Sequence, residues 1–235
     1  MPASDGGPVL CVLRRAPRAV DNPALDVAIS AANVLARSVA VVLQAPLSDD
    51  AIGELRDRLR TRSVGLLLDR AERPLEQLVA DLRPSLVVAD VLVSSAAPLW
   101  LVDAESLVPR SLLLGSAQAR QRYLELLPKF VVPLHEPTAH RFFRGAEVGN
   151  PALSRRPERA LREAVTSGLG EAALSSLRDY LERGLLGPRQ VALALRGAVS
   201  EATRQRALHQ LIVEPELARL CPPRPALSLC AARSA

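Results

Sequence analysis

The chain has 235 residues, of which 49% are hydrophobic and 3% aromatic, so it is long enough to bury a core and too apolar to be disordered. Its net charge is +5, and Lys129 is the only lysine among its positive side chains. Its three cysteines and three histidines lack metal-ligand or redox spacing, and no apolar stretch is long enough for a membrane span. We therefore expect no metal site and, because the start of the chain does not look like a signal peptide, a cytoplasmic protein.

The arginine excess has two explanations. Arginine binds phosphate in a bidentate way, which would favour nucleic acid as a partner. Alternatively, a GC-rich coding sequence favours arginine over lysine throughout the chain. The arginines are scattered and offset by nearby acids, as in 54–60. Because nucleic-acid surfaces are usually denser basic stripes, charge alone does not predict DNA binding.

The first half of the chain alternates apolar runs with amphipathic stretches. Asp21 and Asn22 resemble an N-cap, and Pro23 suits the first position of a helix. Helices are expected at 23–34, from Ser48 onward, and at 74–82. Five apolar runs are typical of buried strands: 8–13, 39–43, 64–68, 86–90 and 99–102. This alternation predicts an α/β fold, a parallel sheet with helices on both faces.

The connection between the fourth and fifth runs is too short for a helix. Only about eight residues separate Asp90 from Leu99, and a helical crossover needs at least about ten to twelve. Either the fifth strand pairs differently from the others, or a crossover helix has been deleted. Trp100, the only tryptophan, and Cys11 are expected in the core.

The second half of the chain is predicted to be helical. A helix at 117–127 precedes a linker at 131–158 that is rich in proline and glycine. The sequence from Cys221 onward has neither a helical nor a strand period. Apolar spacing predicts helices at about 157–167, 171–183, 188–197 and 200–213.

Five phrases in a fixed order carry a family resemblance. The first matches R-x-x-R-x-x-D-N-x-A-L with Arg15, Arg18, Asp21, Asn22 and Leu25. Residues 102–109 are similar to V-D-A-H-N-I-V-P, and 126–128 to L-L-P. Residues 175–193 align without a gap on S-R-L-S-P-Y-L-H-F-G-Q-I-S-P-R-x-V-A-L, and 211–218 resemble L-I-V-R-R-E-L-A. Together they resemble the class II DNA photolyases of the photolyase/cryptochrome family.

This resemblance implies a light-driven carbon–carbon lyase. In the family, FAD in a helical domain donates an electron to a pyrimidine dimer flipped out of DNA, and an α/β domain can hold an antenna pigment. The implied division is a photolyase-like α/β domain at 8–110, an interdomain linker at 111–160, the start of the FAD-binding domain at 161–220, and an unstructured tail at 221–235.

The implied FAD site departs from the family pattern. The flavin-phosphate clamp T-S-R-L-S corresponds to 174–178, which makes its cofactor-binding residues Ser175, Ser176, Leu177 and Arg178. One threonine and one serine hydroxyl of the clamp are replaced, and Arg178 either contacts phosphate or lies on a solvated helix face. Where the family has two arginines, this chain has Glu214 and Pro215, and the proline is expected to break the helix. FAD is therefore expected not to be retained.

The sequence ends where the family continues with most of the flavin pocket, the tryptophan relay and the DNA surface. We therefore expect a truncated photolyase-like protein, inactive alone unless a second chain completes it, with no catalytic residue assigned. The alternative is a non-catalytic module that binds a nucleotide or pigment at the carboxyl edge of the strands. Arg15, Arg18 and Asp21 would lie at that edge, either facing the ligand or as an intradomain ion pair and helix cap.

The expected truncation also bears on stability. Helices cut from a larger domain would leave apolar side chains in water, which costs roughly 1.5–3 kcal/mol for each large side chain. We therefore expect 131–160 to be cleaved first by a protease, followed by the C-terminal helices. The side chains concerned are Leu174, Leu177, Leu181, Val191, Leu195, Leu208, Leu211 and Ile212.

Overall fold

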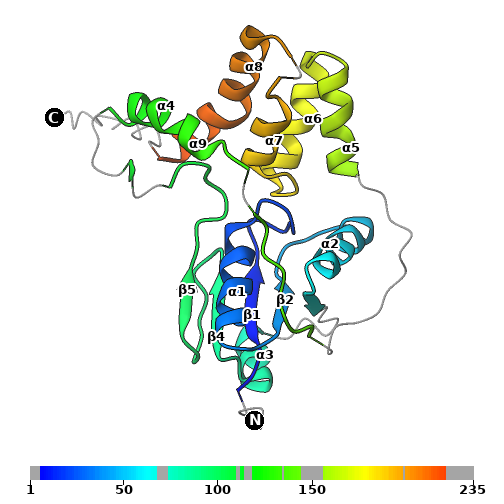
Figure 1. Ribbon diagram of the computed structural model, residues 1–235, viewed down its shortest axis with the longest axis vertical. Coiled ribbons are helices and arrows are strands. Elements are labelled where there is room, and N and C mark those ends of the chain that lie inside the picture. The colour runs from blue at the N-terminus through cyan, green and yellow to red at the C-terminus, as the bar shows by residue number, and fades with distance from the viewer. Residues whose placement is uncertain are drawn as a thin grey trace, which may run out of the picture.

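A computed structural model describes residues 6–67, 74–109, 112–113, 118–133, 135–143, 156–197 and 199–220. The described part contains a five-stranded parallel sheet in the order β3-β2-β1-β4-β5 (Figure 1). The α/β prediction is confirmed. The strands are β1 Val9–Leu13, β2 Val39–Leu43, β3 Gly65–Leu67, β4 Leu86–Ala89 and β5 Leu99–Leu101.

Helices cover both faces of the sheet, as the alternating pattern predicts. Val9, Cys11 and Leu13 share a core with α1 (Pro23–Val34) and α2 (Asp49–Thr61). Leu10 and Val12 point the other way and pack with α3 (Leu75–Leu82). Because successive side chains of a strand point to opposite faces, β1 needs an apolar residue at every position. Cys11 is a fully buried free thiol, as expected.

The fifth strand pairs in parallel with β4, so the explanation in which it pairs differently is wrong. Residues 90–98 join the two strands without a helix. The expectation that Trp100 lies in the core is also wrong, because 52% of its surface is exposed. The physical reason is that β5 is an edge strand and its connection supplies no helix to cover it.

Beyond the sheet, the described chain is helical from 156 to 220, apart from its turns. In Figure 1 the strands point toward these helices, which therefore lie beyond the carboxyl ends of the strands. The helices are α4 Ala119–Phe130, α5 Arg156–Thr166, α6 Glu171–Glu182, α7 Pro188–Ala194, α8 Glu201–Leu208, the π-helix η2 His209–Val213 and α9 Glu214–Leu220. We call α4 to α9 the helical part.

The helical part has a hydrophobic core of its own. Leu177, Val191 and Leu195 are fully buried in it, and Leu211 and Ile212 are almost so. The expectation that these apolar faces remain in water is therefore wrong. Helices α5, α6, α7 and η2 cover one another's apolar sides. Of the side chains named in that expectation, only Leu181 is half-buried rather than buried.

Pro215 does not break the helix, contrary to the sequence prediction. Residues 201–220 form one continuous helical stretch in which the five-residue π-helix η2 joins α8 to α9. A proline inside a helix lacks an amide hydrogen and clashes with the carbonyl four residues earlier. Pro215 is instead the second residue of α9, directly after a π-turn that displaces that carbonyl.

Part of the expected linker lies against the sheet rather than between the two halves. Ala139 is buried in the same core as β1, and its amide donates to the carbonyl of Arg62 over 2.9 Å. The amide of His140 donates to Asn33 Oδ1 over 2.8 Å. The chain thus returns from α4 to α1 and α2 before α5 begins. The predicted tail, 221–235, lies outside the described residues.

Candidate functional site

The loop that follows β1 forms the centre of the carboxyl edge of the sheet. Asp90, directly after β4, accepts hydrogen bonds from the backbone amides of Arg14 at 2.9 Å, Arg15 at 2.9 Å and Ala16 at 2.8 Å. A carboxylate that accepts several amides fixes a loop strongly. Sequence analysis missed this role of Asp90, although an aspartate placed directly after a buried strand was a usable signal.

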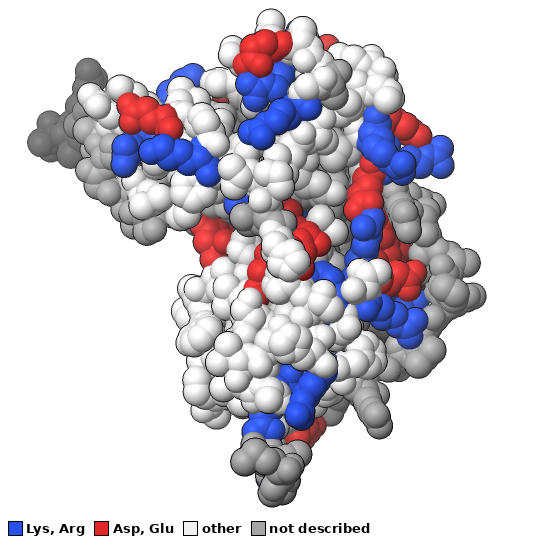
Figure 2. All heavy atoms as spheres, in the orientation of Figure 1, with Lys and Arg blue, Asp and Glu red and all other residues white. Residues whose placement is uncertain are grey.

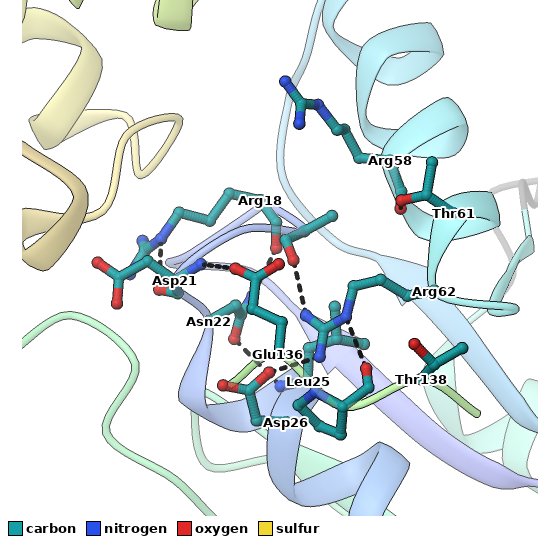
Figure 3. Close-up of polar contacts among 12 residues, drawn as sticks. Arg18, Asp21, Asn22, Leu25, Asp26, Arg58, Thr61, Arg62, Glu136 and Thr138 are labelled. Atoms are coloured by element: carbon teal, nitrogen blue, oxygen red, sulfur yellow. Dashed lines mark hydrogen bonds and ion pairs between the residues drawn. The ribbon is translucent and has the colours of Figure 1, made fainter. Parts of the chain in front are cut away.

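Arg18 is the buried cation of this loop (Figure 3). Its guanidinium donates to the carbonyls of Asp21 at 3.0 Å and Ala104 at 2.6 Å, and to that of Gly184 in the helical part at 3.4 Å. Burial lowers the pKa of Arg18, while nearby carboxylates, Asp21 first, oppose this effect. Because its donors are occupied by the protein, Arg18 organises the site more than it offers charge to a ligand.

Asp21 joins the loop to the helical part. Its carboxylate accepts from Arg189 Nη1 at 2.8 Å and from the amides of Arg189 at 3.0 Å and Gln190 at 3.2 Å, at the start of α7. Asn22, not Asp21, caps α1 by accepting from the amide of Leu25 at 3.1 Å. The interpretation of Asp21 as part of an intradomain ion pair and cap is therefore wrong, because its partner is 168 residues away.

Two glycines allow this close approach. A Cβ at Gly187 would lie 2.1 Å from Asp21 Oδ2, and one at Gly184 would lie 2.2 Å from the carbonyl oxygen of Arg15. Gly184 also has a positive φ of 69°, which disfavours other residues. The loop between α6 and α7 therefore sits directly on the loop between β1 and α1.

A cavity of about 190 Å³ opens beside this contact, between the carboxyl edge of the sheet and the helical part. We call it the edge cavity. The β1–α1 loop from Pro17 to Val20 and the first turns of α2 line one side of it. The other side comes from the helical part: Pro157, Glu158, Tyr180, Arg183, Leu185 and Gln190.

Charged side chains of both signs surround the edge cavity. Arg58 of α2 and Glu158 of α5 form an ion pair between its two walls. Figure 2 shows positive and negative side chains gathered on the side of the molecule where α2 faces α5. A neighbouring hollow of about 360 Å³ shares Arg183 with the cavity and adds Arg14 and Arg15. The site thus combines apolar surface with four exposed or partly exposed arginines, Arg14, Arg15, Arg58 and Arg183.

A second buried arginine, Arg62, supports the α2 side of the site (Figure 3). It pairs with Asp26 at 2.5 Å and donates to the carbonyls of Ala19 at 2.7 Å and Pro137 at 3.0 Å. Burial raises the pKa of Asp26, and the hydrogen bond from Arg62 works against that rise. Arg62 thereby connects the β1–α1 loop, α1 and the segment 135–143.

The candidate flavin clamp lies elsewhere, on α6. Ser175, Ser176 and Arg178 are exposed on this helix, whereas Leu177 is fully buried in the helical core. Because interior helix amides are already hydrogen-bonded within the helix, these residues present no backbone cradle for a diphosphate. They therefore do not fit an FAD diphosphate in the way that the resemblance implies. Arg178 does line a small hollow of about 30 Å³ with Arg15 and Arg219.

No protein-family model and no curated protein matches the sequence. A solved structure does match: the bacterial class III photolyase from Agrobacterium tumefaciens, with a TM-score of 0.61 and 16% sequence identity, over 93% of this chain and 59% of that chain. The chain has a photolyase fold. It spans 59% of the length of that photolyase, and the likeness at 16% identity concerns the fold, so it does not decide between class II and class III.

The photolyase fold places the edge cavity between the α/β sheet and the helices that follow it. In open parallel sheets, ligands bind at the carboxyl ends of the strands, which is where this cavity lies.

Among the helices of the described residues, none combines the length and apolarity that a membrane crossing requires.

Proposed function

We propose that this chain is a class II photolyase-like protein that binds a small planar anion, a nucleotide or a pigment, in the edge cavity. We further propose that it does not repair DNA by itself. The observation that carries the proposal is the edge cavity itself, enclosed by the β1–α1 loop and the helical part and fixed by the bonds of Arg18 and Asp21.

The lining of the cavity supports this ligand class. Tyr180, Leu55 and Leu185 offer apolar surface to a ring. Arg183, whose ion pair with Asp179 is exposed to solvent, offers positive charge to a phosphate or carboxylate, whereas Arg58 is already paired with Glu158. At about 190 Å³ the cavity is smaller than the roughly 300–1,000 Å³ of drug-sized sites, but the neighbouring hollow extends it. A compact ring therefore suits the cavity, with its anionic group directed toward Arg183.

Flavin-dependent repair is not proposed for the chain alone. The clamp residues on α6 do not form a phosphate cradle, and the side chain of Leu177 is fully buried in the helical core. A role in repair would need residues other than this clamp to hold the FAD diphosphate. Any contact of Ser175, Ser176 or Arg178 with a cofactor would then involve their exposed side of α6.

The test is a binding measurement on the full chain. Absorption of the purified protein shows whether a pigment is bound, and titration with FMN and with AMP, followed by calorimetry, measures affinity. We expect Arg183→Ala and Tyr180→Ala each to weaken binding by roughly tenfold. Arg159→Ala is the matched control, because Arg159 is exposed on α5 outside the cavity and pairs with Glu163. Lack of binding by both probes, or equal affinity in all variants, would contradict the proposal.

A further inference from the structure

Strand β5 forms an open edge of the sheet, with β4 as its only neighbour in the sheet. Pro98 accepts from the amide of Val87 over 2.8 Å, and the amide of Val102 donates to Ala89 over 2.9 Å. Backbone groups of alternate residues face the same side in a strand, so those of Leu99 and Leu101 face outward. In the described part of the chain, neither residue has a backbone partner at this edge.

This edge is also uncharged and apolar. No residue from 91 to 102 carries a charge, in a chain with a net charge of +5. Trp100 is 52% exposed, Leu101 58% and Leu92 80%. In Figure 2 the region of β5 is white, whereas charged side chains gather elsewhere on the same face. Edge strands of monomeric proteins are usually protected by charges, bulges or a covering segment, and the described residues provide none for β5.

We propose that β5 pairs with β5 of a second copy of this chain, antiparallel, around a twofold axis at Trp100. In that register Leu99 lies opposite the partner's Leu101, and their outward amides and carbonyls form reciprocal hydrogen bonds. Trp100 lies opposite the partner's Trp100 as a pair without mutual backbone bonds, with Cα atoms about 4.5 Å apart. The two sheets join into one.

A second copy fits this edge better than an unrelated partner for two reasons. The pattern of outward donors and acceptors is self-complementary about Trp100, so a twofold axis satisfies both strands at once. The net charge of +5 makes two copies repel each other over most of their surfaces, and the 91–102 segment is uncharged, so the repulsion is least there. Because the strand has only three residues, the dimer is weak and reversible.

The experiment follows the single tryptophan of the full chain. Sedimentation velocity from micromolar to millimolar protein should show a monomer–dimer equilibrium. Over the same range, circular dichroism should develop an exciton couplet between two indoles, which only a pair of Trp100 side chains can supply. Trp100→Phe should remove the couplet and keep the dimer. A monomer at all concentrations, or a dimer without the couplet, overturns the proposal.

Two variants separate edge pairing from other association. Leu101→Pro removes an outward amide that β4 does not use, and Leu101→Lys places a charge on the edge; each should weaken dimerisation by roughly tenfold or more. Val34→Lys is the matched control, because Val34 is 85% exposed and belongs to α1 rather than to the edge strand. If Val34→Lys weakens the dimer as much as Leu101→Lys does, the interface lies elsewhere and the proposal fails.

Discussion

Glu216 is a carboxyl group buried where three segments meet. It is 4% exposed, and it accepts hydrogen bonds from the amide of Leu107 and from the hydroxyl of Tyr123, each at 2.8 Å. Burial raises the pKa of Glu216 from 4.5 to about 7, with the bond from Leu107 as the largest opposing effect. Local sequence pattern did not predict this buried carboxyl group, because α9, α4 and the 107–108 segment meet only in the folded chain.

The free energy of unfolding should therefore fall as the pH rises through about 7. The folded protein holds the Glu216 proton more tightly than the unfolded chain, so stability is greatest below the unfolded pKa and is lost above the folded one, by about 3 kcal/mol. Glu216→Gln should flatten this dependence between pH 5 and pH 8, measured by urea unfolding. Glu171→Gln, at the exposed start of α6, is the control and should leave the pH profile unchanged.

Asp21 and Arg189 form an ion pair that is largely buried. The side chain of Asp21 is 9% exposed and that of Arg189 12%, so Asp21→Asn should cost about 2–3 kcal/mol of stability by weakening a buried charged pair. Asparagine tolerates the left-handed backbone of this position, where φ is 50°. Asp179→Asn, which breaks a surface pair with Arg183, should cost less than about 1 kcal/mol. Equal effects of the two substitutions on urea midpoints would contradict this role for Asp21.

At the scale of elements, local pattern predicted most of the fold. The run from Val9 to Leu13 is apolar at each position and became the central strand, and Asn22 with Pro23 marked the start of α1. Predictions from local sequence pattern were wrong where contacts with distant parts of the chain determine the structure. Trp100 looked like a core residue but lies on an uncovered edge, and Pro215 looked like a helix breaker but follows a π-turn.

We expect a proline to destabilise α9 much less at position 215 than at other positions of the helix. Pro215→Ala should change stability by less than about 1 kcal/mol, because the π-turn before Pro215 already displaces the carbonyl that its ring would otherwise meet. Ala218→Pro, at an exposed position inside α9, should cost about 3 kcal/mol and reduce helical circular dichroism. If Pro215→Ala stabilised the protein by as much as Ala218→Pro destabilises it, the π-turn would not be accommodating the proline.

In the whole molecule, the sheet carries an apolar cluster on each face, which together we call the sheet core, and the helical part has a core of its own. Sequence analysis placed Arg18 and Asp21 at the carboxyl edge, and the structure does so too. It did not foresee that α2, α5 and α6 complete the edge cavity, because those walls depend on contacts between distant residues such as Arg58 and Glu158. The spacing of apolar residues shows which side of a helix or strand packs into its own core. It does not show which surfaces of two separate cores come into contact.

The contact between the two cores can be tested at a single glycine. Gly187 and Gly170 are the N-cap residues of α7 and α6, and both have negative φ, so alanine strains neither backbone. An alanine Cβ at Gly187 would meet Asp21 at 2.1 Å, whereas one at Gly170 meets nothing within 4 Å. Gly187→Ala should therefore cost about 1–3 kcal/mol, the range for overpacking a tight site.

Gly170→Ala should stay within about 0.5 kcal/mol of the unmodified chain. Because Asp21 holds α7 against the β1–α1 loop, Gly187→Ala should also uncouple the two cores. Tryptophan fluorescence reports unfolding of the sheet through Trp100, and far-ultraviolet circular dichroism reports mainly the helices. In Gly187→Ala, the urea unfolding curves from these two probes should therefore no longer coincide. Coincident transitions in Gly187→Ala at undiminished stability would mean that the cores are joined mainly through other contacts, such as the ion pair of Arg58 and Glu158.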